Sequence, residues 1–197
     1  MQMKPTSPQP SVFLVNNHDS FTYNLVELLR QCEIPFQVCD VEKVDLALIE
    51  PFSHILISPG PDVPSAYPQL FEIYNKFHQS KSILGVCLGH QSLWEFFGGE
   101  LKQLQAPRHG ERRYCHVNAP SLLFADLPKD FYVGLYHSWA VKNMPSDFPL
   151  DVTAQCDDNV VLAYQHKSLP IYGIQFHPES IMSEFGLQIM QNWLAIK

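Results

Sequence analysis

The 197-residue chain is 46% apolar, 12% aromatic and 17% charged, a composition that excludes an intrinsically disordered chain and a coiled coil. Its length allows a sizeable hydrophobic core that needs neither disulfides nor a metal. The net charge of -7, from 20 acidic and 13 basic residues, predicts neither nucleic acid nor an anionic membrane as a partner, because no basic excess neutralises phosphates.

The sequence contains no sign of membrane insertion or export. Its longest apolar runs, near residues 83–88 and 160–164, are far shorter than the roughly 18 residues that span a bilayer. The first ten residues carry one Lys, three Pro and no apolar core, so residues 1–10 are predicted to be a flexible tail and not a secretory signal. The five cysteines form no C-x-x-C pair and no metal-ligand spacing. We therefore expect a soluble cytoplasmic protein with no cofactor and no metal.

From residue 11 onward, short apolar runs alternate with amphipathic stretches, a pattern typical of a parallel sheet with crossover helices. Residues 12–15 are predicted as a buried strand. A helix follows, with apolar residues at positions 21, 25, 28 and 29 and with Asp19 and Ser20 as candidate N-caps. Further strands are predicted at 36–39 and 55–57. The second ends at Ser58-Pro59-Gly60-Pro61, which predicts a sharp turn, and a second helical stripe then covers residues 70–77.

Residues 82–86 are predicted as another strand, which leads through Cys87 into a helix over 90–97 that Gly98-Gly99 ends. After Glu100 the apolar runs shorten, and we expect strands at 114–117, 131–136, 152–154, 160–165 and 171–176 with a closing helix over 183–196. No repeat or linker divides the chain. The prediction is one α/β domain over residues 11–197, with three layers, a mostly parallel central sheet, flanking helices and a more β-rich C-terminal half.

The segment 85–89, Gly-Val-Cys-Leu-Gly, places Cys87 at the predicted junction of strand and helix. A nucleophile between two glycines is typical of the strained turn on which hydrolases carry their catalytic serine. At such a turn the amide of Leu88 can bind a developing oxyanion, and the N-terminus of the helix favours a thiolate. The alternative is that Cys87 is a small buried hydrophobe and that the glycines serve only packing.

A candidate base lies in His177-Pro178-Glu179, directly after the apolar run 171–176. Because Pro178 disfavours the α region for His177, the segment is predicted to be extended, with residues i and i+2 facing the same way. Glu179 can then orient the imidazole of His177, as the acid does in a catalytic triad. Taken alone, the tripeptide is also typical of a capped turn.

The turn at 58–61 is a third candidate element, because the amide of Gly60 can supply a second oxyanion donor. The alternative here is an ordinary turn stiffened by proline. Together with Cys87, His177 and Glu179, the turn completes a nucleophile, a base with its orienting acid and an oxyanion site. This combination predicts acyl transfer through a thioester.

Four segments resemble a known family: 19–25 (DSFTYNL), 58–61 (SPGP), 86–91 (VCLGHQ) and 173–180 (GIQFHPES). They are similar to the triad-type, class I glutamine amidotransferases, and among these to the glutaminase subunits of anthranilate synthase and aminodeoxychorismate synthase. The resemblance extends from about residue 11 to 193 in the family's order and spacing. It implies that Cys87 attacks the γ-carboxamide of glutamine, that His177 protonates the departing ammonia, that Glu179 holds His177, and that Leu88 and Gly60 supply the oxyanion amides.

The resemblance also implies a site for the amino-acid end of glutamine. Gln91, one turn into the helix, would contact the α-amino and carboxylate groups, with help from the backbone of Ser138 and Trp139. A strand end with a buried aromatic ring is the alternative for residues 136–139. The chain departs from the family at Asn16, His18, Asp62, Leu135 and 109–113, which raises the question of whether the loop near glutamine and the docking of a partner differ.

Ammonia released from glutamine is useful only if an acceptor receives it, and one glutaminase domain leaves no room for a synthase domain. The resemblance therefore implies a protein partner, the chorismate-using synthase large subunit (component I), which makes anthranilate or 4-amino-4-deoxychorismate. Two alternatives stay open. One is a stand-alone cysteine hydrolase of γ-glutamyl substrates on the same fold. The other is a scaffold subunit without activity, although the presence of Cys87, His177 and Glu179 together argues against it.

Overall fold

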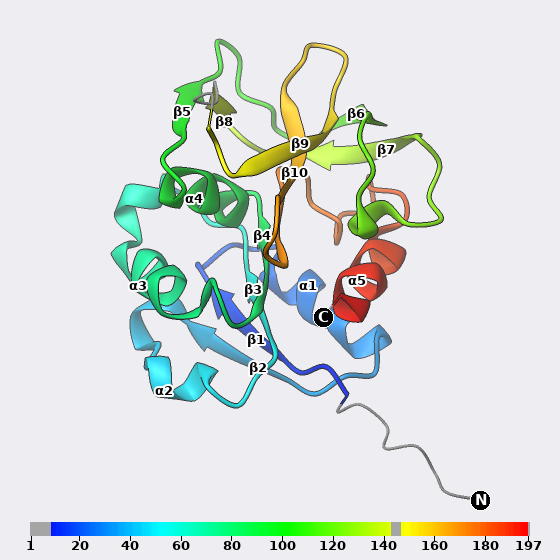
Figure 1. The fold of residues 1–197 in the computed structure, drawn as a ribbon. Coiled ribbons are helices and arrows are strands. Elements are labelled where there is room, and N and C mark those ends of the chain that lie inside the picture. The colour runs from blue at the N-terminus through cyan, green and yellow to red at the C-terminus, as the bar shows by residue number, and fades with distance from the viewer. Residues whose placement is uncertain (1–8, 143–146, 197) are drawn as a thin grey trace, which may run out of the picture.

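The computed structural model describes residues 9–142 and 147–196, and its centre is a nine-stranded sheet (Figure 1). The first five strands are parallel and lie in the order β2 (Phe36–Asp40), β1 (Val12–Asn16), β3 (His54–Ile57), β4 (Ser82–Val86) and β11 (Ile171–Ile174). From β11 the sheet continues through the antiparallel strands β10 (Val161–His166), β9 (Leu150–Gln155), β6 (Glu111–Val117) and β7 (Asp130–Leu135). A separate antiparallel pair joins β5 (Glu100–Gln103) to β8 (Trp139–Lys142).

Helices cover both faces of the parallel strands, which gives the three predicted layers (Figure 1). On one side lie α1 (Thr22–Gln31) and α5 (Gly186–Ala195), and on the other α3 (Pro68–Phe77) and α4 (Leu88–Phe96), together with the short α2 (Leu46–Ile49). Because successive strand residues face opposite sides, Leu14 packs with the α1 and α5 layer while Phe13 packs with the α3 and α4 layer. The α/β fold predicted from sequence is confirmed, and so is the β-rich C-terminal half.

Several element boundaries differ from the predictions. Helix α1 begins at Thr22 and its N-cap is Phe21, so neither Asp19 nor Ser20 is the N-cap. The Asp19 Oδ1 accepts from the Phe21 N–H at 2.8 Å instead. Helix α4 begins at Leu88, two residues earlier than predicted, because it starts directly at the Cys87 turn. Helix α5 begins at Gly186 and not at residue 183, because Phe185 has a left-handed backbone with φ 59°. The sequence did not predict α2, β5 or β8, and the tail predicted over 1–10 lies largely outside the described residues.

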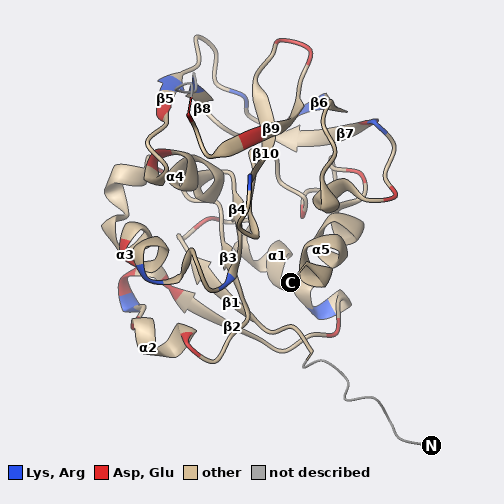
Figure 2. Cartoon of the chain, in the orientation of Figure 1, with Lys and Arg blue, Asp and Glu red and all other residues tan. Residues whose placement is uncertain are grey.

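Lysine and arginine positions alternate with aspartate and glutamate positions along the helices, strands and loops (Figure 2). Within residues 9–142 and 147–196, no helix has the length and apolarity that crossing a membrane requires.

One exposed ion-pair cluster on the antiparallel strands makes stability depend on pH. The two ring nitrogens of His116 contact carboxylate oxygens of Asp130 at 2.5 Å and Asp157 at 2.7 Å, so both nitrogens carry a proton. These hydrogen bonds, with Asp130 the larger contributor, raise the pKa of His116. The ion pairs therefore stabilise the folded state fully below the ordinary histidine pKa of about 6.5, and this contribution is lost as pH rises through the higher folded-state value.

We expect His116→Gln to lower the free energy of unfolding at pH 5.5 by at most about 1 kcal/mol, because the pairs are partly exposed. The difference from the wild type should shrink as the pH approaches 10. Urea unfolding of both proteins across this range measures the effect. A difference that grew with pH would contradict the assignment of a protonated His116.

Candidate active site

Cys87 lies at the carboxyl end of β4, on the tight turn that the sequence predicts. Its backbone has φ 52° and ψ −97°, a sparsely populated region for a residue with a side chain. The Cys87 N–H donates to the Ile174 carbonyl on β11 at 2.8 Å, and the Cys87 carbonyl accepts from the Gln91 N–H at 3.0 Å. The turn is therefore held by both the sheet and the first turn of α4, and Cys87 is 7% exposed.

A close approach between β4 and α4 explains the glycine before Cys87. A Cβ added to Gly85 would lie 2.3 Å from the carbonyl carbon and oxygen of Gly89. Strand and helix thus touch through their backbones, which only glycine allows at position 85. The close approach on which the predicted nucleophile-bearing turn depends is present in the structure.

His177 and Glu179 form a buried pair behind the turn. The His177 Nδ1 lies 2.7 Å from the Glu179 Oε1, and both side chains are at most 2% exposed. Burial acts against a charge on His177, but the Cys87 sulfur and the Glu179 carboxylate outweigh it and raise the pKa of His177 well above its usual value. The His177 Nε2 is buried and has no hydrogen-bond partner among the described residues.

The predicted contact between His177 and Glu179 exists, but the extended segment predicted to produce it is wrong. Strand β11 ends at Ile174, and residues 177–180 form a turn that the Ser180 N–H closes onto the His177 carbonyl at 3.2 Å. A turn brings the two side chains together because it folds Glu179 back onto the ring. The rings of Phe21 and Tyr136 pack against His177 and against each other, with centroids 5.2 and 4.9 Å from the His177 ring, and restrict its orientation.

The two amides predicted to bind an oxyanion donate no hydrogen bond within the described part of the chain. Within residues 9–142 and 147–196, neither the Leu88 N–H nor the Gly60 N–H has an acceptor. The loop that carries Gly60 is fixed by Asn17, whose backbone N–H donates to the Ser58 Oγ at 2.9 Å and whose side chain donates to the Ser58 carbonyl at 2.8 Å. The sequence reasoning missed Asn17, because its partner is 41 residues away.

A cavity of about 330 Å³ opens beside Cys87. Among the residues that line it are Gly60, Cys87, Gln91, Ser138 and Trp139. The structure therefore brings the predicted nucleophile, one oxyanion residue and all three predicted substrate-binding residues to one cavity. Leu88, His177 and Glu179 do not line this cavity: Leu88 and His177 are each 1% exposed, and the Glu179 side chain is fully buried.

Two of the predicted binding residues, Gln91 and Trp139, are hydrogen-bonded to each other. The Gln91 Nε2 donates to the Trp139 carbonyl at 2.8 Å and to the Gln175 Oε1 at 3.1 Å. The Ser138 carbonyl accepts from the Leu104 N–H at 2.9 Å. The sequence reasoning also missed Gln175, which is fully buried and whose Nε2 lies 3.6 Å from the Cys87 sulfur. Its position two residues before His177 was the available signal.

His137 is a further missed residue on the cavity wall. It is 3% exposed, and its Nδ1 lies 2.7 Å from the Trp139 carbonyl, which can only accept, so Nδ1 carries a proton. Burial lowers the pKa of His137 to about 4, which leaves the ring neutral at physiological pH. The Nε2 of His137 is therefore an acceptor, and it has no partner in the described part of the chain.

Four of the positions that depart from the family pattern fall into two groups. Asp62 and His109 line the cavity beside Cys87. Arg112 lies outside the cavity, where it pairs with Glu184 at 2.9 Å. Leu135 is buried at the end of β7. Arg112 is therefore a surface position, and Leu135 is a position in the packed core.

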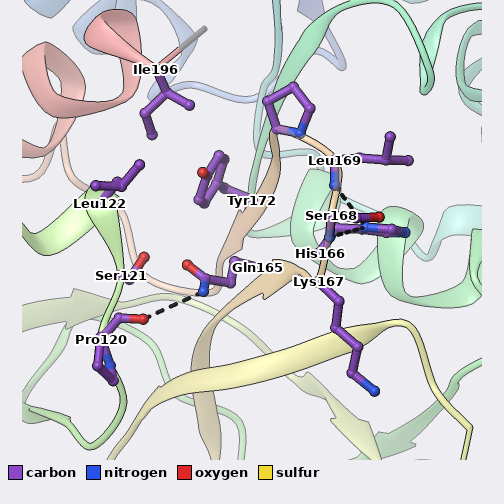
Figure 3. A pocket seen from close by; sticks show the side chains of 11 residues that line it. Pro120, Ser121, Leu122, Gln165, His166, Lys167, Ser168, Leu169, Tyr172 and Ile196 are labelled. Carbon is purple, nitrogen blue, oxygen red and sulfur yellow. Dashed lines mark hydrogen bonds between the residues drawn. The ribbon is translucent and has the colours of Figure 1, made fainter.

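A second cavity, of about 500 Å³, lies at the opposite end of the sheet (Figure 3). It is lined by Pro170 and Tyr172 at the start of β11, whereas Cys87 follows the carboxyl end of the parallel strand β4. Figure 3 shows Leu122, Tyr172 and Ile196 on one side and the Gln165 side chain bonded to the Pro120 carbonyl. None of the described residues that line this cavity is a cysteine, and the predicted chemistry belongs to the cavity at Cys87.

Comparisons with known proteins identify the family of this chain. The family model for glutamine amidotransferase class-I matches residues 13–196. A Haemophilus influenzae protein, provisionally named anthranilate synthase component II, is 58% identical over 187 residues, covering 94% of this chain and 96% of the relative. The aminodeoxychorismate/anthranilate synthase component 2 of Bacillus subtilis is 36% identical over 187 residues, covering 93% of this chain and 95% of that protein. A solved Thermoplasma acidophilum structure, provisionally described as one of the subunits of GMP synthase, has the same fold, with a TM-score of 0.85 at 22% identity over 96% of this chain and 94% of that chain.

The family match covers the whole sheet from β1 to β11 and both helix layers, and it includes the Cys87 turn and the His177–Glu179 pair. The family predicted from the four motifs is thereby confirmed. This chain belongs to the class-I glutamine amidotransferase family.

Proposed function

We propose that this chain is a glutaminase subunit that hydrolyses glutamine through a Cys87 thioester and delivers ammonia to a chorismate-using synthase large subunit. The observation that carries the proposal is the position of Cys87, on a strained turn beside a buried histidine whose Nδ1 is held by Glu179 and whose Nε2 has no hydrogen-bond partner in the described part of the chain. A nucleophile, a proton carrier and an orienting carboxylate in this order are the parts of a covalent acyl-transfer site.

The chemistry follows from these parts. The Cys87 sulfur forms a bond to the γ-carbonyl carbon of glutamine, and the amides of Leu88 and Gly60 hold the oxyanion that results. As the C–N bond breaks, the Nε2 proton of His177 passes to the leaving nitrogen, and ammonia departs. Water then attacks the thioester, His177 takes its proton, and glutamate leaves while Cys87 is restored. Glu179 keeps the imidazole in one orientation through both steps.

The partner is inferred from the family relatives. Proteins that match this chain over at least 93% of its length carry the names anthranilate synthase component II and aminodeoxychorismate/anthranilate synthase component 2. On this basis the acceptor of ammonia is component I, which makes anthranilate or 4-amino-4-deoxychorismate. The five cysteines are all free thiols, which supports a reducing, cytoplasmic location.

Mixing experiments test the proposal. Glutamine hydrolysis and chorismate conversion are measured with the purified chain alone, with an anthranilate synthase large subunit and with an aminodeoxychorismate synthase large subunit. Stimulation by one partner names the product, and stimulation by both identifies a shared glutaminase. If neither partner raises glutaminase activity above background, the chorismate assignment fails, and turnover of a γ-glutamyl peptide by the free chain would instead identify a stand-alone hydrolase.

Gly60→Ala is expected to lower glutaminase kcat about 10²-fold, as for the loss of one oxyanion donor. A Cβ at this position would lie 2.3 Å from the Leu88 Cδ2 and 2.9 Å from the Asn17 Cβ, so the loop has to move and its amide moves with it. Steady-state kinetics with glutamine in the two-subunit complex measure the loss. The unfolding midpoint of the variant is the control, and an unchanged kcat in a folded variant would remove Gly60 from the oxyanion site.

A further inference from the structure

The backbone predicted to receive the amino-acid end of glutamine is supported by a neighbouring segment, residues 104–110. This segment joins β5 to β6 and lies beside residues 135–138, most of which fall between β7 and β8 and belong to neither strand. Three of its N–H groups donate to carbonyls of 135–138 at 2.9 to 3.0 Å: Leu104 to Ser138, Arg108 to His137 and Gly110 to Leu135. The position of the cavity wall at Ser138 and Trp139 therefore depends on what fixes residues 104–110.

The side chain of Arg108 fixes this segment. Of residues 101–110, all of which the structure describes, Arg108 alone is buried, and its side chain is 7% exposed. A buried guanidinium needs partners that replace water for its charge and its donors. A buried charged side chain on a segment that is otherwise exposed or half-buried indicates that its contacts decide where the segment lies.

The partners of Arg108 lie on the turn between β9 and β10. The Arg108 Nη1 donates to the Cys156 Sγ at 3.3 Å, and its Nη2 donates to the Asp158 Oδ2. The Cys156 thiol donates to the Asp158 Oδ1 at 2.9 Å, so each of the three side chains contacts the other two. Burial acts against a charge on Asp158, but the Cys156 thiol and the Arg108 charge outweigh it and lower the pKa of that carboxyl. Arg108 and Asp158 are therefore a charged pair at neutral pH.

The turn that holds Arg108 belongs to the same sheet as the nucleophile. Strand β10 pairs with β11, and β11 pairs with β4, which leads directly into Cys87. The guanidinium of Arg108 thus contacts the central sheet, while its backbone N–H holds the His137 carbonyl. His137, Ser138 and Trp139 all line the cavity beside Cys87. Arg108 therefore connects the sheet that carries Cys87 to the wall of its cavity.

We propose that Arg108 is a positioning residue for glutamine: held by Cys156 and Asp158, it fixes the backbone at 137–139 that receives the substrate. Because this role concerns glutamine binding, it rests on the proposed function. Displacement of this backbone weakens binding in the ground state and in the transition state alike, which raises KM and leaves kcat nearly unchanged. A pair that only kept the chain folded would instead determine the amount of active complex, and its loss would leave KM the same.

The test uses Arg108→Met, which keeps the length of the side chain and removes its charge and donors, in the complex with the synthase large subunit. We expect the KM for glutamine to rise about tenfold, because a shift of about 1 Å in a binding group is costly, while kcat changes less than about threefold. Synthesis from ammonium salt should stay at the wild-type level. Arg30→Met, which breaks an exposed pair with Glu27 at 3.5 Å on α1, is the control for the same substitution.

The outcomes distinguish this role from maintenance of the fold and from the proposed function. A fall in kcat with an unchanged KM, or a parallel loss of synthesis from ammonium salt, would assign the pair to stability alone and overturn the inference. Unchanged KM and kcat in a folded Arg108→Met would overturn it as well. If Arg108→Met does not fold, Asp158→Asn takes its place with the same expected split, because the Asp158 side chain is 53% exposed and can be neutralised without opening the core. A wild-type complex that hydrolyses no glutamine would instead overturn the proposed function itself.

Discussion

Cys87→Ala is expected to abolish glutamine-dependent product formation by the two-subunit complex, while synthesis from added ammonium salt continues. The variant removes the sulfur atom that forms the thioester, whereas free ammonia enters the reaction in the synthase subunit. The alanine side chain is smaller than cysteine and keeps the turn between β4 and α4 free of new contacts. Product formation with glutamine and with ammonium chloride is measured on the same preparation.

A second cysteine of this chain, Cys32, provides the control for Cys87→Ala. Cys32→Ala alters a half-buried thiol at the end of α1 and should leave both activities near the wild-type level. If Cys87→Ala lost synthesis from ammonium salt as well, in a complex that still forms, the assignment of Cys87 to the ammonia source alone would fail. Retention of glutamine-dependent synthesis would remove Cys87 from the chemistry altogether.

The parts of the fold that depend on local sequence could be predicted. Residues 82–86 form a strand, Cys87 forms a tight turn and a helix follows, because an apolar run and glycines at 85 and 89 leave few other arrangements. The same holds for the turn at Gly60, where two prolines end the strand. Local steric limits decide such segments, and a single sequence carries them in full.

The parts that depend on distant partners could not be predicted. Strands β5 and β8 are short and only partly apolar, and they exist because they pair with each other across a long stretch of chain, as Glu100 does with Lys142. Gln175 was missed for the same reason, because its partner Gln91 lies on α4, 84 residues away in the chain.

The His177–Glu179 pair lies between these cases. The sequence identified both residues and their contact, but it predicted a strand end where the chain makes a turn. Proline at 178 disfavours a helix at His177, and it does not distinguish an extended segment from a turn. The turn is selected by tertiary contacts, because the Ser183 Oγ donates to the His177 carbonyl and the His177 N–H donates to Gly134 on β7 at 3.1 Å.

His177→Ala is expected to lower kcat for glutamine by about 10³-fold or more, as for removal of the base of a catalytic triad. The variant removes the proton that the leaving ammonia needs and leaves Glu179 as a buried carboxylate with no partner among the described residues. Kinetics of the assembled complex measure the effect, and circular dichroism checks that the fold is kept. A loss of less than about tenfold in a folded variant would assign the proton transfer to another group.

Glu179→Gln tests how the pair works, because it keeps the size of the side chain and removes its charge. The carboxylate is one of the two groups that raise the pKa of His177 against the effect of burial, so its removal lowers that pKa. His177 has to be protonated to release ammonia, and its proton is lost as pH rises through the pKa. The alkaline limb of the kcat/KM profile should therefore move to lower pH in Glu179→Gln. A fall in activity with an unmoved limb would mean that Glu179 only positions the ring.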